Sequence, residues 1–217
     1  MAFLDEKIAQ LQKQALIAKK HDADKKKIKE EESEKIKAEN IIELTQEEVT
    51  QAIKNGLLEQ NEEKLIFENK TFFHGKLVMP MFKDFFDEFM ENESLYCWSK
   101  KHVFSALLSK SKLKEDINNV NDLTDKMKSS FKEKDIYIEL LSSMEDVNEN
   151  YSKYTITTRM PTALDYMYQY MVYFKYGDEI INLIFTCLEK DKRQWEKIMV
   201  GISELIEINE GDILSNE

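Results

Sequence analysis

The chain has 217 residues, a formal net charge of -11 and a composition of 42% hydrophobic, 34% charged and 11% aromatic residues. This length suits one domain of ordinary size plus an appendage, and the composition suffices for a packed interior, which argues against a mostly disordered chain. Because a phosphate backbone binds mainly through clustered lysine and arginine, the acidic charge also argues against nucleic-acid binding.

The amino-terminal segment carries a short, coiled-coil-like stripe. Leu4, Ile8, Leu11, Ala15 and Ala18 recur at alternating steps of four and three, which places them on one face of a helix. Residues 19–39 follow with eight lysines against seven acidic residues, and such a segment buries little. Two interpretations stay open: a solvated helix, or a helix that docks on a partner through Leu4, Ile8 and Leu11.

The helical part of the sequence is predicted to end near residue 57. Thr45 and Glu48 have the spacing of a capping box, which marks a helix start, and Gly56 is placed to act as a left-handed cap at its end. After Glu63 the apolar period becomes strand-like. We therefore predict a helical arm over residues 1–62, an α+β domain over residues 63–209 and a flexible tail over residues 210–217.

Apolar runs predict several strands and two helices in the domain. The strands are expected at residues 65–67, 72–73, 77–80, 95–98, 103–108, 136–144 and 205–208. One helix is expected over residues 116–131, opened near Asp116, and a second around Trp195 and Met199.

The last long hairpin is the most specific local prediction. Gly177-Asp178 separates a strand ending at Tyr176 from a strand beginning at Glu179, and a two-residue loop fixes the register between them. The paired residues on one face are all apolar or aromatic: Phe174 with Ile181, Val172 with Leu183, Tyr170 with Phe185 and Tyr168 with Cys187. The opposite face is more polar, which predicts a sheet buried on one side and wetter on the other.

Residue types that carry catalysis or bind metals are sparse. The sequence has no glycine-rich phosphate loop, no paired-histidine zinc motif and no Cys-x-x-Cys, and its three histidines lie far apart. We expect no enzymatic activity, no cofactor and no metal site.

The compartment can be predicted from the amino terminus and the cysteines. The first six residues are acidic and lack the pattern of a signal peptide, and no apolar run approaches membrane-spanning length. We expect a cytoplasmic protein with no membrane insertion, in which Cys97 and Cys187 are reduced and packed as small apolar side chains.

Two aromatic groups are candidate recognition surfaces. Phe82, Phe85, Phe86 and Phe89 fall at i, i+3, i+4 and i+7, which predicts one stripe of a short helix. This stripe either packs in the core or lines a groove for an apolar partner, since the methionines around it adapt to varied surfaces.

The second group lies on the strand before Gly177. Because the hairpin pairing turns Tyr168 and Tyr170 inward, Met167, Met171 and Tyr173 are placed on the outer face of the sheet. An exposed face of this kind would indicate binding, and burial under the helix of residues 116–131 is the alternative.

The order of these elements, the run Phe72-Phe73-His74-Gly75-Lys76-Leu77-Val78-Met79-Pro80 and residues 173–195 together suggest a known fold. Over about residues 64–208 the chain resembles the PsbP-like α+β sandwich. Photosystem PsbP proteins share this fold with a Ran-binding nuclear import factor, DcrB and Eag-type chaperones of type VI secretion effectors. It implies an antiparallel sheet sandwich with packed helices that serves as a binding scaffold rather than an enzyme.

Three hypotheses of function follow. The first is an adaptor or chaperone whose domain holds an apolar helical segment of a protein client, with the arm as a second contact, in keeping with a role for a secreted effector in a bacterial secretion system. The second is a self-associating assembly component whose arm packs against other copies. The third is a small-molecule-binding or hydrolytic domain, which requires a deep polar pocket.

Overall fold

The computed structural model of the chain describes residues 44–60, 63–163 and 165–209. The chain divides at Thr45, and the compact unit that begins there contains all the elements below. Its helices are α2 (Gln46–Lys54), α3 (Val120–Glu133), the short 3₁₀ helix η1 (Glu189–Asp191) and α4 (Lys192–Glu204). Among the described residues, no helix is long and apolar enough to cross a membrane.

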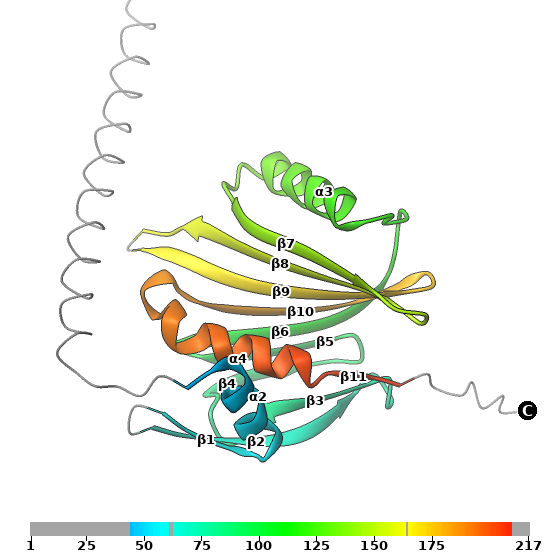
Figure 1. Ribbon diagram of the computed structural model, residues 1–217. Helices are drawn as coiled ribbons and strands as arrows, with labels where there is room; N and C mark the ends of the chain where they lie inside the picture. Colours follow the sequence, from blue (N-terminus) through cyan, green and yellow to red (C-terminus); the bar gives the residue numbers. More distant parts are fainter. Residues whose placement is uncertain (1–43, 61–62, 164, 210–217) are drawn as a thin grey trace, which may run out of the picture. The chain divides into compact units, whose positions relative to one another are not determined.

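Two antiparallel sheets form the domain (Figure 1). The smaller sheet has the order β1-β2-β3-β11 and the larger one the order β4-β5-β6-β10-β9-β8-β7. The strands are β1 (Leu57–Gln60), β2 (Glu63–Phe72), β3 (Leu77–Phe82), β4 (Glu88–Glu91), β5 (Leu95–Lys100), β6 (Phe104–Lys112), β7 (Glu139–Val147), β8 (Ser152–Pro161), β9 (Tyr166–Tyr176), β10 (Glu179–Leu188) and β11 (Glu207–Ile208).

One face of the larger sheet, here called the inner face, is covered by α4 and by the smaller sheet. From β9 and β10 it presents alternate side chains that are at most 6% exposed, namely Tyr168, Tyr170, Val172, Phe174, Ile181, Leu183, Phe185 and Cys187. Two polar groups of this layer are satisfied by α4, because the Tyr168 hydroxyl donates to Glu196 (2.8 Å) and the Tyr170 hydroxyl lies 2.9 Å from the Ser203 hydroxyl.

Helix α2 is fixed against α4. It begins with the predicted capping box, in which the Glu48 amide donates to the Thr45 hydroxyl (3.2 Å) and the Thr45 amide donates to the Glu48 carboxylate (2.7 Å). A Cβ atom at Gly201 of α4 would lie 2.8 Å from Ile53 Cδ1 and 3.3 Å from the Thr50 Cα atom, so the two helices approach more closely than a larger residue allows.

The other face of the larger sheet, the outer face, is covered in part by α3 (Figure 1). The helix begins at the Asn119 cap and contributes Leu123 to a second apolar cluster under it. The sheet residues of this cluster are Tyr154, Ile156, Met171 and Ile180. On the same face, away from this cluster, Met167, Cys97 and Leu107 are half-buried.

The structure confirms the predicted α+β class and the hairpin register, in which all four predicted pairs are present. It contradicts the helix expected over the phenylalanines at 82–89, because β3 ends at Phe82 and β4 begins at Glu88. Strands β1 and β4 were not predicted, and the prediction gave no bounds for β8. The division of the chain at Thr45 also differs from the predicted boundary near residue 62, because α2 and β1 bury Val49, Ile53 and Leu58 within the domain.

Candidate functional site

An aromatic cluster lies at one end of the layer between the two sheets. Phe82 at the end of β3 has its ring centroid 4.7 Å from that of Phe85, and Phe104 at the start of β6 lies 4.7 Å from Trp195 of α4. Phe86 packs edge-on against Phe85 at 5.1 Å. Such contacts fix the relative positions of three elements that are far apart in the sequence, since offset and edge-to-face rings attract beyond simple burial.

Two rings of this cluster, Phe85 and Trp195, line an open cleft of about 590 Å³. The cleft is lined by the start of β2, the turn after β3, the β5–β6 turn and the first residues of α4, that is by residues 63–66, 83–85, 100, 103, 191, 194 and 195. Trp195 is 2% exposed, whereas Ile66 and Val103 at the rim are 50% and 36% exposed. The cleft therefore has a fixed aromatic base and an apolar rim open to solvent.

The charges around the cleft balance. Its lining includes Lys64, Lys83 and Lys100 together with Glu63, Asp84 and Asp191, three of each sign. Lys64 pairs with Glu59 (2.7 Å), and the Lys100 ammonium lies 4.5 Å above the Phe85 ring and 3.4 Å from the Phe85 carbonyl oxygen. A neutral lining of this kind does not select for a strongly charged ligand.

The cleft offers charged groups and aromatic rings for contact with a ligand. Carboxylates, ammonium groups and aromatic rings line it, and no histidine, cysteine, serine or threonine does. Within the described ranges, no group of three or more His, Cys, Asp or Glu side chains could hold a metal ion. The arrangement suits an apolar side chain that inserts among the rings, with polar groups at the rim that fix its orientation.

Three of the four predicted phenylalanines meet here, although not as a helical stripe. Phe82, Phe85 and Phe86 belong to the aromatic cluster, and Phe89 lies in β4 opposite Trp98 with 74% of its side chain exposed. Sequence reasoning missed Trp195, Phe104 and Val103 as members of the site. No sequence signal connects them, because the fold brings them together from separate segments.

The predicted outer-face residues divide into two kinds. Met171 is 2% exposed under α3, and Tyr173 packs against the same cluster, while Met167 is half-buried on the uncovered part. Burial raises the pKa of Tyr173 to about 12, and its hydroxyl donates to the Met171 sulfur at 3.4 Å. Burial under α3 is thus the correct alternative for Met171 and Tyr173. Leu4, Ile8 and Leu11 lie outside the described residues.

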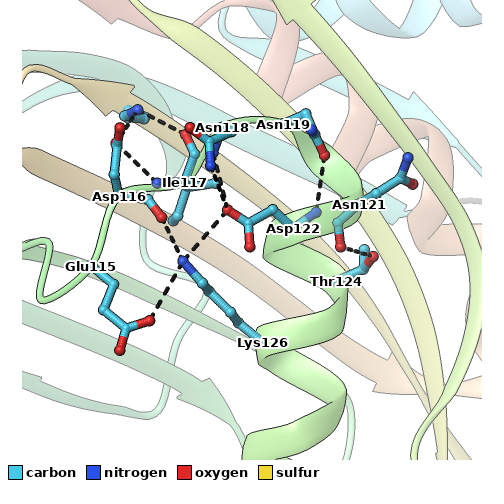
Figure 2. Close-up of polar contacts among 10 residues, drawn as sticks. Glu115, Asp116, Ile117, Asn118, Asn119, Asn121, Asp122, Thr124 and Lys126 are labelled. Atoms are coloured by element: carbon cyan, nitrogen blue, oxygen red, sulfur yellow. Dashed lines mark hydrogen bonds and ion pairs between the residues drawn. The ribbon is translucent and has the colours of Figure 1, made fainter.

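A group of polar residues at the start of α3 has the composition of a cation site but not its geometry (Figure 2). Asp116 and Asp122 are approached by lysines: the Lys175 ammonium lies 2.5 Å from Asp116 Oδ1, and the Lys126 ammonium lies 3.5 Å from Asp122 Oδ2. Lys175 also donates to the Ile117 carbonyl oxygen at 2.7 Å. Two ammonium groups satisfy these carboxylates, so this network anchors α3 to β9.

A separate group of charged residues joins the two sheets. Glu179 at the start of β10 pairs with Lys76 of the β2–β3 turn (2.8 Å) and with Lys110 of β6 (3.2 Å). The hydrogen bond from Lys76, supported by Lys110, lowers the pKa of Glu179 to about 2. Asn209 adds a bond to the same turn by donating to the Gly75 carbonyl oxygen at 3.0 Å. These contacts hold the sheets together at the end of the β9–β10 hairpin.

Sequence comparison yields no relative for this chain. No family model matches it, and no curated protein matches it.

Comparison of structures gives the fold. The solution structure of cyanobacterial PsbP (CyanoP) from Synechocystis sp. PCC 6803 is similar over 66% of this chain and 92% of that chain, with a TM-score of 0.55 and 8% identity. PA94, a protein of unknown function from Pseudomonas aeruginosa, covers 67% of this chain and 99% of its own length with a TM-score of 0.43 and 7% identity. The similarity to CyanoP shows that the domain has a PsbP-like α+β fold, and at this identity it shows the fold alone.

Proposed function

We propose that this protein is a non-enzymatic adaptor or chaperone that binds a protein client in the aromatic cleft. The observation that carries the proposal is the contrast between the buried Trp195 at the base of the cleft and the half-exposed Ile66 and Val103 at its rim. A rigid aromatic base supplies contact area without a large loss of side-chain freedom, and an exposed apolar rim excludes water around an inserted group.

The proposed occupant is an apolar helical segment of the client. An amphipathic helix presents side chains at i, i+3, i+4 and i+7, and a cleft of about 590 Å³ has room for a few of them. The balanced charge of the lining favours an apolar segment over a strongly basic or acidic one. The proposal also includes the narrower resemblance to DcrB and Eag-type effector chaperones, a cytoplasmic location and a role beside a bacterial secretion system.

The test places a photo-crosslinking amino acid at position 103 of the full-length tagged chain in its native cells. The matched control places it at Met90, which is 56% exposed on β4 and does not line the cleft. We expect a protein crosslinked through position 103 and not through position 90, and we expect Val103→Asp to abolish its co-purification while Met90→Asp retains it.

Two results would contradict the proposal. Equal crosslinking at both positions would mean that the crosslinked protein does not prefer the cleft. Recovery of only the chain itself would favour the self-association hypothesis. Deletion of residues 1–43, which leaves the compact unit from Thr45 whole, then tests the arm as a second contact. Loss of the client on this deletion would place part of the binding energy on the arm.

A further inference from the structure

Strand β7 is the longer of the two edges of the larger sheet. It has nine residues and pairs only with β8, whereas β4 at the opposite edge has four residues. Six of the nine residues of β7 are exposed. A long, accessible edge exposes unpaired backbone donors and acceptors, which is the requirement for adding another strand.

The register tells which backbone groups of β7 face outward. The Asn148 amide donates to the Tyr151 carbonyl oxygen (3.1 Å), so this pair is hydrogen-bonded, and bonding alternates along an antiparallel ladder. Asp146, Met144 and Ser142 therefore direct their amide and carbonyl groups toward β8. The amides and carbonyls of Val147, Glu145 and Ser143 point away from β8, toward the position that an added strand would occupy.

The apolar surface of the domain is concentrated along the same segment. Ten large apolar side chains are exposed among the described residues, and five of them lie between residues 136 and 147: Ile136, Tyr137, Leu141, Met144 and Val147. Met144 and Val147 are 67% and 63% exposed. Edge strands are usually blunted by charge, proline or covering segments. β7 carries carboxylates and has α3 beside it, so the exposed apolar side chains are what indicate a place for another chain.

The charge of the segment decides what kind of chain fits. Residues 135–149 contain five carboxylates and no lysine or arginine. Glu139 is paired with Arg159 (2.7 Å) and Glu145 accepts from the Val120 amide (3.1 Å). Asp146 and Glu149 have no ion-pair partner within the described part of the chain, although Lys153 on β8 exerts a Coulomb interaction with Asp146 while donating to the Ser203 carbonyl oxygen.

We propose that the β7 edge binds an extended segment of a partner protein that carries lysine or arginine between apolar, β-branched side chains. Its backbone bonds the outward groups of Ser143, Glu145 and Val147, and its basic side chains approach Asp146 and Glu149. A second copy of this chain is disfavoured as the occupant, because it would set five carboxylates against five. This surface lies outside the lining of the aromatic cleft, so the proposal of a β7 partner is independent of the proposed function.

The probe is a nine-residue peptide of alternating lysine and valine, labelled for fluorescence anisotropy and titrated with the full-length protein. Two control peptides have the same length: one with glutamate in place of lysine, and one with a proline at every third position, which cannot extend a sheet. We expect binding of the lysine peptide alone, and we expect it to weaken as salt is added.

The variants are Ser143→Pro and Ser143→Val. Because the Ser143 amide faces outward, proline removes an edge donor without breaking a bond to β8, and valine retains that donor. We expect Ser143→Pro to weaken peptide binding by about tenfold or more and Ser143→Val to leave it unchanged or stronger. A circular dichroism melt of each variant establishes that the fold is retained.

Hydrogen exchange on the unmodified protein gives a second measurement that needs no variant. We expect the lysine peptide to slow exchange at Ser143, Glu145 and Val147 by about tenfold or more, with no change at the amides already bonded to β8. The proposal is overturned by equal binding of the glutamate peptide, by equal binding to Ser143→Pro, or by unchanged exchange at these amides. Dimerisation of the free protein with protection of the same amides would also overturn it, because the occupant would then be a second copy.

Discussion

The two faces of the larger sheet are covered in different ways. The inner face presents Val172, Leu183 and Phe185, each 0% exposed, to α4 and the smaller sheet. The outer face is buried where α3 crosses it, and Met167, which lies away from that cluster, is half-buried. We therefore expect the inner face to determine whether the domain folds. We expect the cover of the outer face to open locally, since local opening depends on how much apolar area a segment buries.

The largest effect is expected from breaking the inner layer. Trp195→Ala removes a side chain that is 2% exposed and contacts Phe104, so we expect the free energy of unfolding to fall by about 3–5 kcal/mol in urea denaturation. Trp98→Ala is the matched control, because Trp98 is half-buried on β5, and we expect a smaller loss. Equal losses for the two tryptophans would show that the layer around α4 is no more important than its periphery.

An intermediate effect is expected from loosening the cover of the outer face. Leu123 of α3 is 8% exposed in the cluster with Met171 and Ile156, so Leu123→Ala should cost about 2–3 kcal/mol. We expect amide exchange to accelerate in α3 much more than in α4, which would be measured by hydrogen exchange with mass spectrometry. Acceleration to the same extent in both helices would mean that the two faces unfold as one unit.

The smallest effect is a dependence on pH at the junction of the two sheets. The pKa of Glu179 is lowered from its ordinary value of 4.5 to about 2, so its stabilisation is fully present above pH 4.5 and is lost as the pH falls toward 2. We expect Glu179→Gln to lower the free energy of unfolding by about 1 kcal/mol at pH 7, after solvent screening, and by almost nothing near pH 2. Denaturation series at both pH values measure this, and the same loss at each would rule out the charge as its cause.

Local pairing could be predicted from the sequence, and the corrections show where such prediction ends. The β9–β10 register followed from a two-residue loop and from the apolar or aromatic partners that it gives Tyr168, Tyr170 and Val172, because both signals lie within one hairpin. The phenylalanines at 82–89 misled the prediction because a strand end, a turn and a new strand happened to match a helical spacing. Asp84 in that turn has a φ of 54°, which a continuous helix cannot contain.

The cleft could not have been assembled from sequence patterns. Its aromatic lining needs Phe85 and Trp195 to meet, and their separation along the chain leaves no periodicity that connects them. Whether the outer face is covered could not be predicted for a similar reason. The amphipathic pattern of residues 116–131 predicted a helix but not which surface it would bury. Packing between distant elements decides both questions, and it depends on the complete fold.

The close contact at Gly201 has a mechanical consequence. Helix α2 is also tied to α4 by side chains, because Gln46 donates to the Lys197 carbonyl oxygen and the Thr50 hydroxyl donates to Glu204. A displacement of α2 is therefore passed on to α4, the helix that carries Trp195 into the lining of the cleft.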